Sequence, residues 1–165
     1  ERLAKRRKLQ GFRLVIIGDT KTRGLLKLNK KAFAINDVEF REFMGRNELY
    51  SIVKRASFVV IPSRWYDNLP NVALESYAHG KAVIAPNHGS FPHFVKDGLT
   101  GVLFESRSVQ SLEEKLEWAL KHVGVMLEMG KEARRYVEKY FSPEGHLEKL
   151  MSVFESVGSI KRSRV

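Results

Sequence analysis

The chain has 165 residues, of which 43% are hydrophobic, and it combines a formal net charge of +10 with a complete lack of cysteine. A chain of this length can bury about two-thirds of its unfolded surface, so one domain with a hydrophobic core is expected. The composition excludes disulfides and thiolate chemistry, and no apolar run reaches the length of about 18 residues that a membrane-spanning helix needs. No signal-type apolar run follows the charged start, so a cytoplasmic protein is expected.

The positive charge is concentrated near the two ends of the sequence. Residues 1–31 carry a net charge of +9 and residues 161–165 carry +3, whereas the residues between them carry −2. A basic edge of this kind is typical of solvated helix surface. Two functional alternatives stay open: peripheral contact with an anionic membrane surface, and nucleic-acid binding, which rests on charge alone.

Apolar runs alternate with helical patterns from the start of the chain onward. Strands are expected at residues 12–18, 38–43, 57–62, 81–86 and 101–104. Helices are expected at 47–56 with Asn47 as a possible N-cap, from Pro70 to Gly80, and over a short segment at 91–98. This alternation predicts an α/β domain whose parallel sheet is flanked by helices on both faces.

From Ser108 onward the pattern is purely helical. Ser111 and Glu114 have the spacing of a capping box, and Pro143 divides the region into at least two further helices. Since no repeat or long linker occurs, we expect a single domain with its core at 12–120 and C-terminal helices at 121–160. Ligands of such sheets bind at the carboxyl ends of the strands. The loops after Gly18, Phe43, Ile61 and Ala85 are therefore the places to look for chemistry.

The loop after the third expected strand, with the helix behind it, holds the most useful groups. A helix entered through Pro70 presents unpaired N–H groups and the positive end of its dipole, which favour an anion. Asp67 precedes this terminus, and Glu75 lies about one and a half turns into the helix, within reach of a ribose. Carboxylates accept strong hydrogen bonds from hydroxyl groups. On spacing alone, however, Asp67 as a simple cap and Glu75 as solvated surface explain the pattern equally well.

Residues 61–104 resemble the C-terminal-domain signature of retaining GT-B glycosyltransferases of group 1, also called family 4. The matching positions are Pro62, Ser63, Asp67, Glu75, Ala78, Gly80, Val83, Ile84, Gly89, Asp97, Gly98, Gly101, Leu103 and Phe104. A looser similarity extends from Phe12 to about Leu120. The resemblance implies a Rossmann-like domain that forms one half of a GT-B fold, with a helical tail that crosses back to the other half.

The resemblance also implies a function, namely binding of a nucleoside-diphosphate sugar whose sugar is transferred with retention of configuration. Asp67 would bind sugar hydroxyls, Glu75 would hold the ribose, and Phe43 and Met44 would contact the base. The remaining donor-binding positions would be the glycine turn at Gly18 and the backbone of Asn68, Leu69, Pro70 and Asn71. No metal is obligatory in the family, because the helix terminus and basic side chains neutralise the diphosphate.

Three departures from the family pattern affect these roles. Asp67 stands where the family has Glu, Ser90 replaces the second glycine of a pair that begins at Gly89, and His93 replaces an acid. The Gly-Arg and Lys-Gly segment that holds the diphosphate in the family does not precede residue 12. Lys21, Arg23 and Lys27 are possible substitutes for its cations, although a basic solvated loop explains these residues too. Gly89 and Ser90 are possible phosphate contacts.

The acceptor-binding N-terminal domain of the same enzyme is the implied partner, and this polypeptide alone is not expected to catalyse transfer. A non-catalytic nucleotide-sugar-binding module, or a subunit that depends on a partner, is the alternative.

Trp65 and Tyr66 are expected to line the donor cleft. His93 is expected to be a surface or structural residue. We interpret the remaining histidines as ordinary residues, not metal ligands: His79, His88, His122 and His146.

Overall fold

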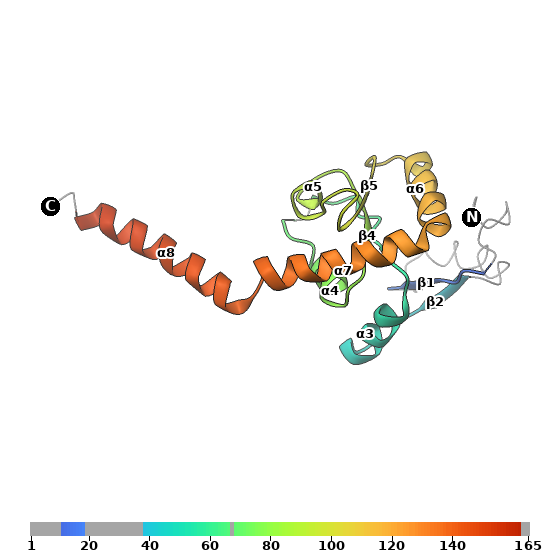
Figure 1. Ribbon diagram of the computed structural model, residues 1–165, viewed down its shortest axis with the longest axis horizontal. Helices are drawn as coiled ribbons and strands as arrows, with labels where there is room; N and C mark the ends of the chain where they lie inside the picture. The colour runs from blue at the N-terminus through green and yellow to red at the C-terminus, as the bar shows by residue number, and fades with distance from the viewer. Residues whose placement is uncertain (1–10, 19–37, 67, 163–165) are drawn as a thin grey trace.

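The computed structural model describes residues 11–18, 38–66 and 68–162, with side chains as far as Val157 (Figure 1). From residue 38 to residue 104 strands and helices alternate, as the apolar runs predict, and helices follow. The elements are β1 (Leu14–Ile17), β2 (Val38–Arg41), α3 (Arg46–Arg55), β3 (Val59–Val60), α4 (Asn71–Ala78), β4 (Val83–Pro86), α5 (Phe91–Phe94), β5 (Gly101–Phe104), α6 (Val109–Lys121), α7 (Val123–Tyr140) and α8 (Pro143–Arg162).

All strand pairs in the described residues are parallel, but they belong to two sheets. β1 pairs with β2, with Leu14 opposite Val38. β3, β4 and β5 form the second sheet in that order, with Val83 of β4 between Val59 and Gly101. The predicted class, parallel strands flanked by helices, is confirmed, with the difference that the strands are divided between a two-stranded and a three-stranded sheet.

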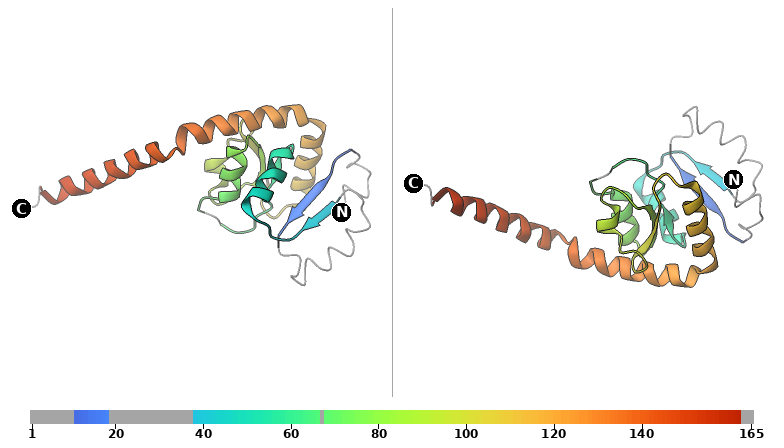
Figure 2. Two further views of the ribbon diagram at one scale, coloured as in Figure 1. Left: turned by 90° about the horizontal axis from the view of Figure 1, so that it is seen from below. Right: turned by 90° about the horizontal axis from the view of Figure 1, so that it is seen from above.

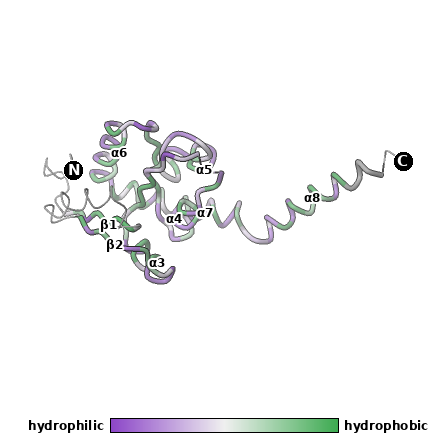
Figure 3. Tube along the Cα trace, turned by 180° about the vertical axis from the view of Figure 1, so that it is seen from behind, coloured by the Kyte–Doolittle hydropathy of each residue, from purple (hydrophilic) through white to green (hydrophobic). Residues whose placement is uncertain are grey.

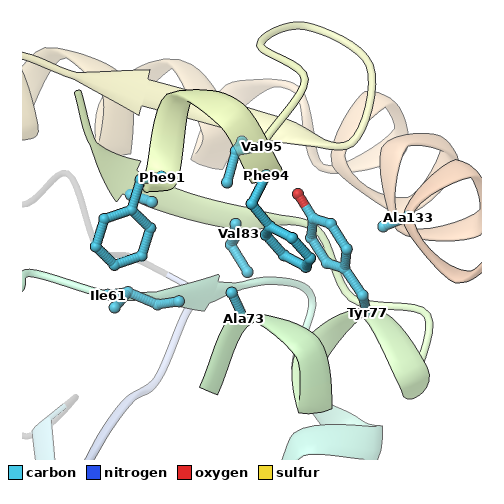
Figure 4. Packing of buried hydrophobic residues seen from close by; sticks show 9 residues of the cluster. Ile61, Ala73, Tyr77, Val83, Phe91, Phe94, Val95 and Ala133 are labelled. Carbon is cyan, nitrogen blue, oxygen red and sulfur yellow. The ribbon is translucent and has the colours of Figure 1, made fainter. Parts of the chain in front are cut away.

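The central strand β4 is buried on both faces, which explains its unbroken apolar sequence. Val83 and Ala85 face a cluster built with α4, α5 and α7, in which Tyr77 and Phe94 stack with ring centroids 4.7 Å apart (Figure 4). Ile84 faces a second cluster, which α6 and α7 complete. Alternate side chains of one strand thus supply two cores, and the β3-β4-β5 sheet is held between layers of helices.

Helix α7 belongs to this core, although the sequence placed the end of the core at residue 120. Its buried side chains Met126, Met129 and Ala133 contribute to the two clusters. Near its middle, Gly130 lies against Gly80. This glycine is the second residue after α4, and only glycine adopts its φ of +68° without strain. The expected boundary is therefore wrong, because α7 crosses the sheet-bearing body before the chain leaves it.

Helix α8 projects away from the rest of the molecule (Figures 1 and 2). Figure 3 shows hydrophobic and hydrophilic segments alternating along it. Its exposed apolar residues recur at helical spacing and form a stripe, the α8 stripe: Leu147, Leu150, Met151, Phe154 and Val157. A stripe of this spacing is typical of a helix that packs against another surface.

The structure corrects the details of three helix starts. α3 begins at Arg46 after Gly45, not with Asn47 as N-cap, and Pro70 is the N-cap of α4 instead of its first helical residue. The capping box at Ser111 is also wrong. Ser108 is the N-cap of α6 and accepts a hydrogen bond from the Ser111 backbone N–H, while the Ser111 hydroxyl accepts one from the Glu105 N–H.

Candidate functional site

The candidate site lies where β3 and β4 end. The loop after β3 leads through residues 62–66 and 68–70 into α4, and residues 87–90 lead from β4 into α5. The Pro70 carbonyl accepts hydrogen bonds from the N–H groups of Ala73 and Leu74, and among the described residues no side chain caps the helix. The first turn of α4 also contains no acidic residue. Its N-terminus therefore offers backbone N–H groups and a positive dipole end to an anion.

His88 joins the two loops of the site. Its Nε2 lies 2.9 Å from the Trp65 carbonyl oxygen, and its ring meets the Tyr66 ring edge-on with centroids 5.0 Å apart. The Ser63 hydroxyl supports the same loop by accepting a hydrogen bond from the Trp65 N–H over 3.2 Å. Because the carbonyl can only accept, Nε2 must carry the hydrogen, which leaves Nδ1 as an acceptor in a neutral ring.

Two buried polar atoms at this place have no hydrogen-bond partner among the described residues, namely His88 Nδ1 and Ser90 Oγ. Between them stands Gly89 with a φ of +59°, a conformation that favours glycine. Buried polar atoms without partners are uncommon in folded proteins and carry a free-energy cost. Their position beside the loop that leads into α4 makes them candidates for hydrogen bonds to a ligand.

Glu75 is half-buried and is held from a second helix. The Tyr50 hydroxyl on α3 donates a hydrogen bond to Glu75 Oε1 over 3.1 Å. The Tyr50 ring also lies against the His79 ring with centroids 4.6 Å apart, and His79 Nδ1 is 2.7 Å from the Glu75 carbonyl oxygen. Burial raises the pKa of Tyr50, and the hydrogen bond to Glu75 raises it further, so the hydroxyl stays protonated at neutral pH.

The other sheet carries the predicted base-contacting residues at its carboxyl edge. The Gly18 N–H donates to the Arg41 carbonyl oxygen over 3.0 Å, so the end of β1 lies beside the end of β2. Phe43 follows with 79% of its surface exposed, Met44 is half-buried, and α3 begins two residues later. Gly18 and Phe43 thus lie at one edge of this sheet, and α3 connects that edge to Glu75.

Ion pairs fix the strand that leads to this edge. Arg41 Nε lies 2.5 Å from Glu39 Oε1, and its Nη1 lies 3.6 Å from Glu48 Oε1 at the start of α3. The hydrogen bond from Arg41 lowers the pKa of Glu39. These groups are partly exposed, so their contribution to stability is small and their main effect is orientation.

Asp67, Lys21, Arg23 and Lys27 lie outside the described residues, and their predicted roles stay predictions. The backbone segment 68–71 leads into α4, and its donor contacts stay a prediction too. Trp65 and Tyr66 are 80% and 75% exposed on the site loop, so their rings are accessible.

The other histidines make local contacts. His93 is exposed on α5, and its carbonyl accepts a hydrogen bond from Lys96 Nζ over 2.9 Å. His122 ends α6, where its ring stacks on Trp118. His146 lines an aromatic hollow at the junction of α7 and α8. Among the residues that the structure describes, no three histidine or acidic side chains gather as metal ligands would.

The Asp-Gly turn of the motif has a structural role. Asp97 Oδ1 accepts a hydrogen bond from the Leu103 N–H over 2.8 Å, which closes the turn before β5. Thr100 in the same turn is buried, and its hydroxyl lies 2.7 Å from the Tyr77 hydroxyl. This part of the motif therefore holds β5 beside β4 and does not belong to the site.

Comparison with known proteins decides the family. The family described as Glycosyl transferases group 1 matches residues 1–136. The chain belongs to this family. An uncharacterized glycosyltransferase of Methanocaldococcus jannaschii is 30% identical over 132 residues, which cover 78% of this chain and 36% of that protein. A D-inositol 3-phosphate glycosyltransferase of Streptomyces avermitilis is 31% identical over 121 residues, covering 73% and 26%. This group 1 glycosyl transferase chain thus spans about a third or less of the length of these relatives.

Solved structures share its fold. The C-terminal domain of the Francisella tularensis group 1 protein LpcC superposes with a TM-score of 0.70 at 23% identity, covering 85% of this chain and 76% of that domain. Anabaena HepE in complex with UDP-glucose gives a TM-score of 0.73 at 17% identity, covering 87% and 41%. The predicted family is confirmed, and the fold is that of the C-terminal half of such enzymes.

The sequence did not reveal two residues of the candidate site in this group 1 glycosyl transferase, Tyr50 and His88. His88 follows β4, so the rule that ligands bind at the carboxyl ends of strands gave a signal for it. Tyr50 gave none, because its partner Glu75 lies 25 residues further along the chain. Within the described part of the chain, no helix has the length and apolar character needed to cross a membrane. The cytoplasmic location stays a prediction.

Proposed function

We propose that the chain binds a nucleoside-diphosphate sugar and forms the donor half of a retaining glycosyltransferase. The observation that carries this proposal is the set of groups that follow β3 and β4: the α4 terminus, which no described side chain caps, the held carboxylate of Glu75 on the same helix, and two buried polar atoms after β4 that lack partners among the described residues. A helix terminus that presents its backbone N–H groups suits a diphosphate, and an ionised carboxylate suits a sugar or ribose hydroxyl. Membership of the group 1 family supports the same assignment.

In this proposal each part of the donor has its own contacts. Glu75 binds the ribose, and Asp67 binds hydroxyls of the transferred sugar. The backbone at 68–71 and the loop with Gly89 and Ser90 surround the diphosphate. At the other sheet the nucleobase lies against Phe43 and Met44, close to Gly18. The Ser90 hydroxyl then has the diphosphate as an acceptor, and His88 Nδ1, which is itself an acceptor, receives a hydrogen bond from a hydroxyl of the transferred sugar.

The proposed chemistry is cleavage of the bond between the sugar and the diphosphate, with the new glycosidic bond formed in the original anomeric configuration. Negative charge grows on the leaving diphosphate as this bond breaks. The α4 terminus stabilises that charge with N–H groups that are already oriented, so little reorganisation is needed during the reaction. No metal is required in this scheme, and undiminished donor binding in the presence of EDTA is the expected result.

The acceptor side of the reaction needs a partner surface. We propose that the acceptor-binding N-terminal domain of the same enzyme supplies it and that the α8 stripe packs on that domain. Two observations support this. The chain spans 36% or less of the length of the relatives described above, and the stripe is exposed along a projecting helix. Transfer activity is accordingly expected only when both domains are present.

The test of donor binding is a calorimetric and NMR titration of the chain with UDP, GDP, ADP and their sugar conjugates. UDP and UDP-glucose come first because Anabaena HepE was solved in complex with them. We expect selective binding with backbone shifts at Gly18, at 68–75 and at Gly89. Binding of duplex DNA that weakens steeply with salt, with no response to any nucleotide, would favour the charge-based alternative and contradict the proposal.

Substitutions locate the site within the same titration. Asp67→Ala and Glu75→Ala are each expected to weaken donor binding by about 1–3 kcal/mol, the range for a lost hydrogen bond to a charged group. Glu114→Ala is the matched control, because it removes an exposed carboxylate on α6. If both site variants bind the donor as tightly as the unmodified chain does, the site assignment is overturned.

A further inference from the structure

The contact between α3 and α4 is made by a tyrosine that no part of the family pattern marks. Tyr50 is a half-buried residue of α3, and its hydroxyl donates a hydrogen bond to Glu75 Oε1 over 3.1 Å. Glu75 itself lies on α4, behind the loop that ends β3. A single hydrogen bond therefore links the helix that follows β2 to the helix that carries the proposed ribose-binding carboxylate.

The Tyr50 ring is held in place independently of this hydrogen bond. It packs against the His79 ring with centroids 4.6 Å apart and an interplanar angle of 38°. His79 lies one turn beyond Glu75 on α4, and its Nδ1 is 2.7 Å from the Glu75 carbonyl oxygen. The hydroxyl is thus presented to Glu75 from a fixed ring, and burial together with the nearby carboxylate raises the pKa of Tyr50 so that the donated proton is kept.

A held carboxylate differs from a free one in what it contributes to binding. A glutamate side chain loses rotamer freedom when a ligand immobilises it, and this loss opposes binding. The bond to Oε1 restricts the side chain beforehand and, among the described residues, leaves Oε2 without a hydrogen bond. Each carboxylate oxygen also has room for more than one donor. Both oxygens are therefore available to two neighbouring hydroxyl groups.

We propose that Tyr50 is a positioning residue that orients Glu75 for the two ribose hydroxyls, so that it sets the preference of the site for ribonucleotides. This inference rests on the proposed ribose contact of Glu75. The helix that carries Tyr50 begins two residues after Met44. The segment that is proposed to contact the base and the carboxylate that is proposed to contact the ribose are joined through one helix and one hydrogen bond.

The test compares UDP with 2′,3′-dideoxy-UDP in calorimetric titrations, and GDP with its dideoxy analogue where GDP binds more tightly. The variants are Tyr50→Phe, Glu75→Gln and the double variant. Tyr50→Phe keeps the ring against His79 and removes only the hydroxyl. We expect it to weaken ribonucleotide binding about threefold to tenfold, with dideoxynucleotide binding changed by less than about twofold. In the Glu75→Gln background it should add little, because the two residues act as one unit.

Tyr140→Phe is the matched control, since it removes an exposed hydroxyl near the end of α7 and should leave both affinities unchanged. Urea unfolding of each variant checks that the fold is intact. If Tyr50→Phe weakens the binding of the ribonucleotide and of the dideoxynucleotide equally, Tyr50 is a merely structural residue and the inference is overturned.

The remaining outcomes separate the two proposals. A ribose preference that disappears in Glu75→Gln but persists in Tyr50→Phe overturns the positioning role and leaves the proposed function standing. A preference unaffected by either substitution overturns the ribose contact of Glu75, and the positioning role with it. If the unmodified chain binds none of the nucleotides, both proposals are overturned together.

Discussion

Replacing Gly130 by alanine is expected to destabilise the domain, although alanine is the better helix former. Gly130 is buried in α7, where a Cβ atom would lie 2.2 Å from the Gly80 carbonyl oxygen and 3.2 Å from the Ala82 nitrogen. All of these neighbours are backbone atoms, so no side chain can rotate to make room. To restore an ordinary contact, α7 must move away from the end of α4 by about 1 Å, against close-packed surroundings.

The magnitude follows from two opposing terms. Overpacking by one carbon costs about 1–3 kcal/mol, and the rigid backbone obstacle places this substitution near the upper limit. Alanine recovers about 1 kcal/mol through its higher helix propensity. The net expectation is a loss of about 2 kcal/mol in the free energy of unfolding.

Gly124 of the same helix provides a matched control. It is exposed, and nothing lies within 4 Å of a Cβ added there. Gly124→Ala should therefore raise the free energy of unfolding, by up to about 1 kcal/mol. Urea unfolding followed by far-ultraviolet circular dichroism measures both variants, and an unchanged m-value shows that they unfold by the same transition. If Gly130→Ala is as stable as the unmodified chain, the close approach of α4 and α7 is not what requires glycine at this position.

Three further substitutions test other parts of the structure. Burial raises the pKa of Tyr77, so the folded state keeps its phenol proton above pH 10, where the unfolded state loses it. The free energy of unfolding should therefore fall as the pH rises through this range. Tyr77→Phe should make this fall less steep, as measured by urea unfolding at pH values from 8 to 10.5. His88→Ala removes the bond to the Trp65 carbonyl and should weaken nucleotide binding about threefold to tenfold, with greater mobility of the Trp65 indole in NMR relaxation. Ser108→Ala removes the N-cap of α6 and should cost about 1 kcal/mol in urea unfolding, whereas unchanged stability would contradict the capping role.

The candidate site shows where sequence reasoning succeeded. Glu75 was placed on a helix behind a strand end because Pro70 and Gly80 mark the limits of that helix, and the structure has α4 between them. Local rules of chain geometry suffice for such predictions. The structure adds that Asp97 closes a turn, a role that the motif alone does not distinguish from a contact with the ligand.

The same reasoning failed where two nearby residues could both serve as the N-cap of one helix. Asn47 and Ser111 both have side chains suited to capping, yet Gly45 and Ser108 occupy the cap positions. The choice between such neighbours depends on where the preceding strand and turn deliver the chain. The end of the core at residue 120 failed for a related reason, because the crossing of α7 over Gly80 is a tertiary event.

The sequence by itself determined the elements of this protein and its family. The period of the apolar residues and the positions of proline and glycine act over a few neighbouring residues, so strands, helices and the motif at 61–104 are legible without a structure. Only the tertiary structure decided the division of the strands between two sheets, the place of α7 in the core, and the pairs Tyr50 with Glu75 and His88 with Trp65. These contacts join residues more than 20 positions apart, and no local preference of the backbone encodes which distant side chains will meet.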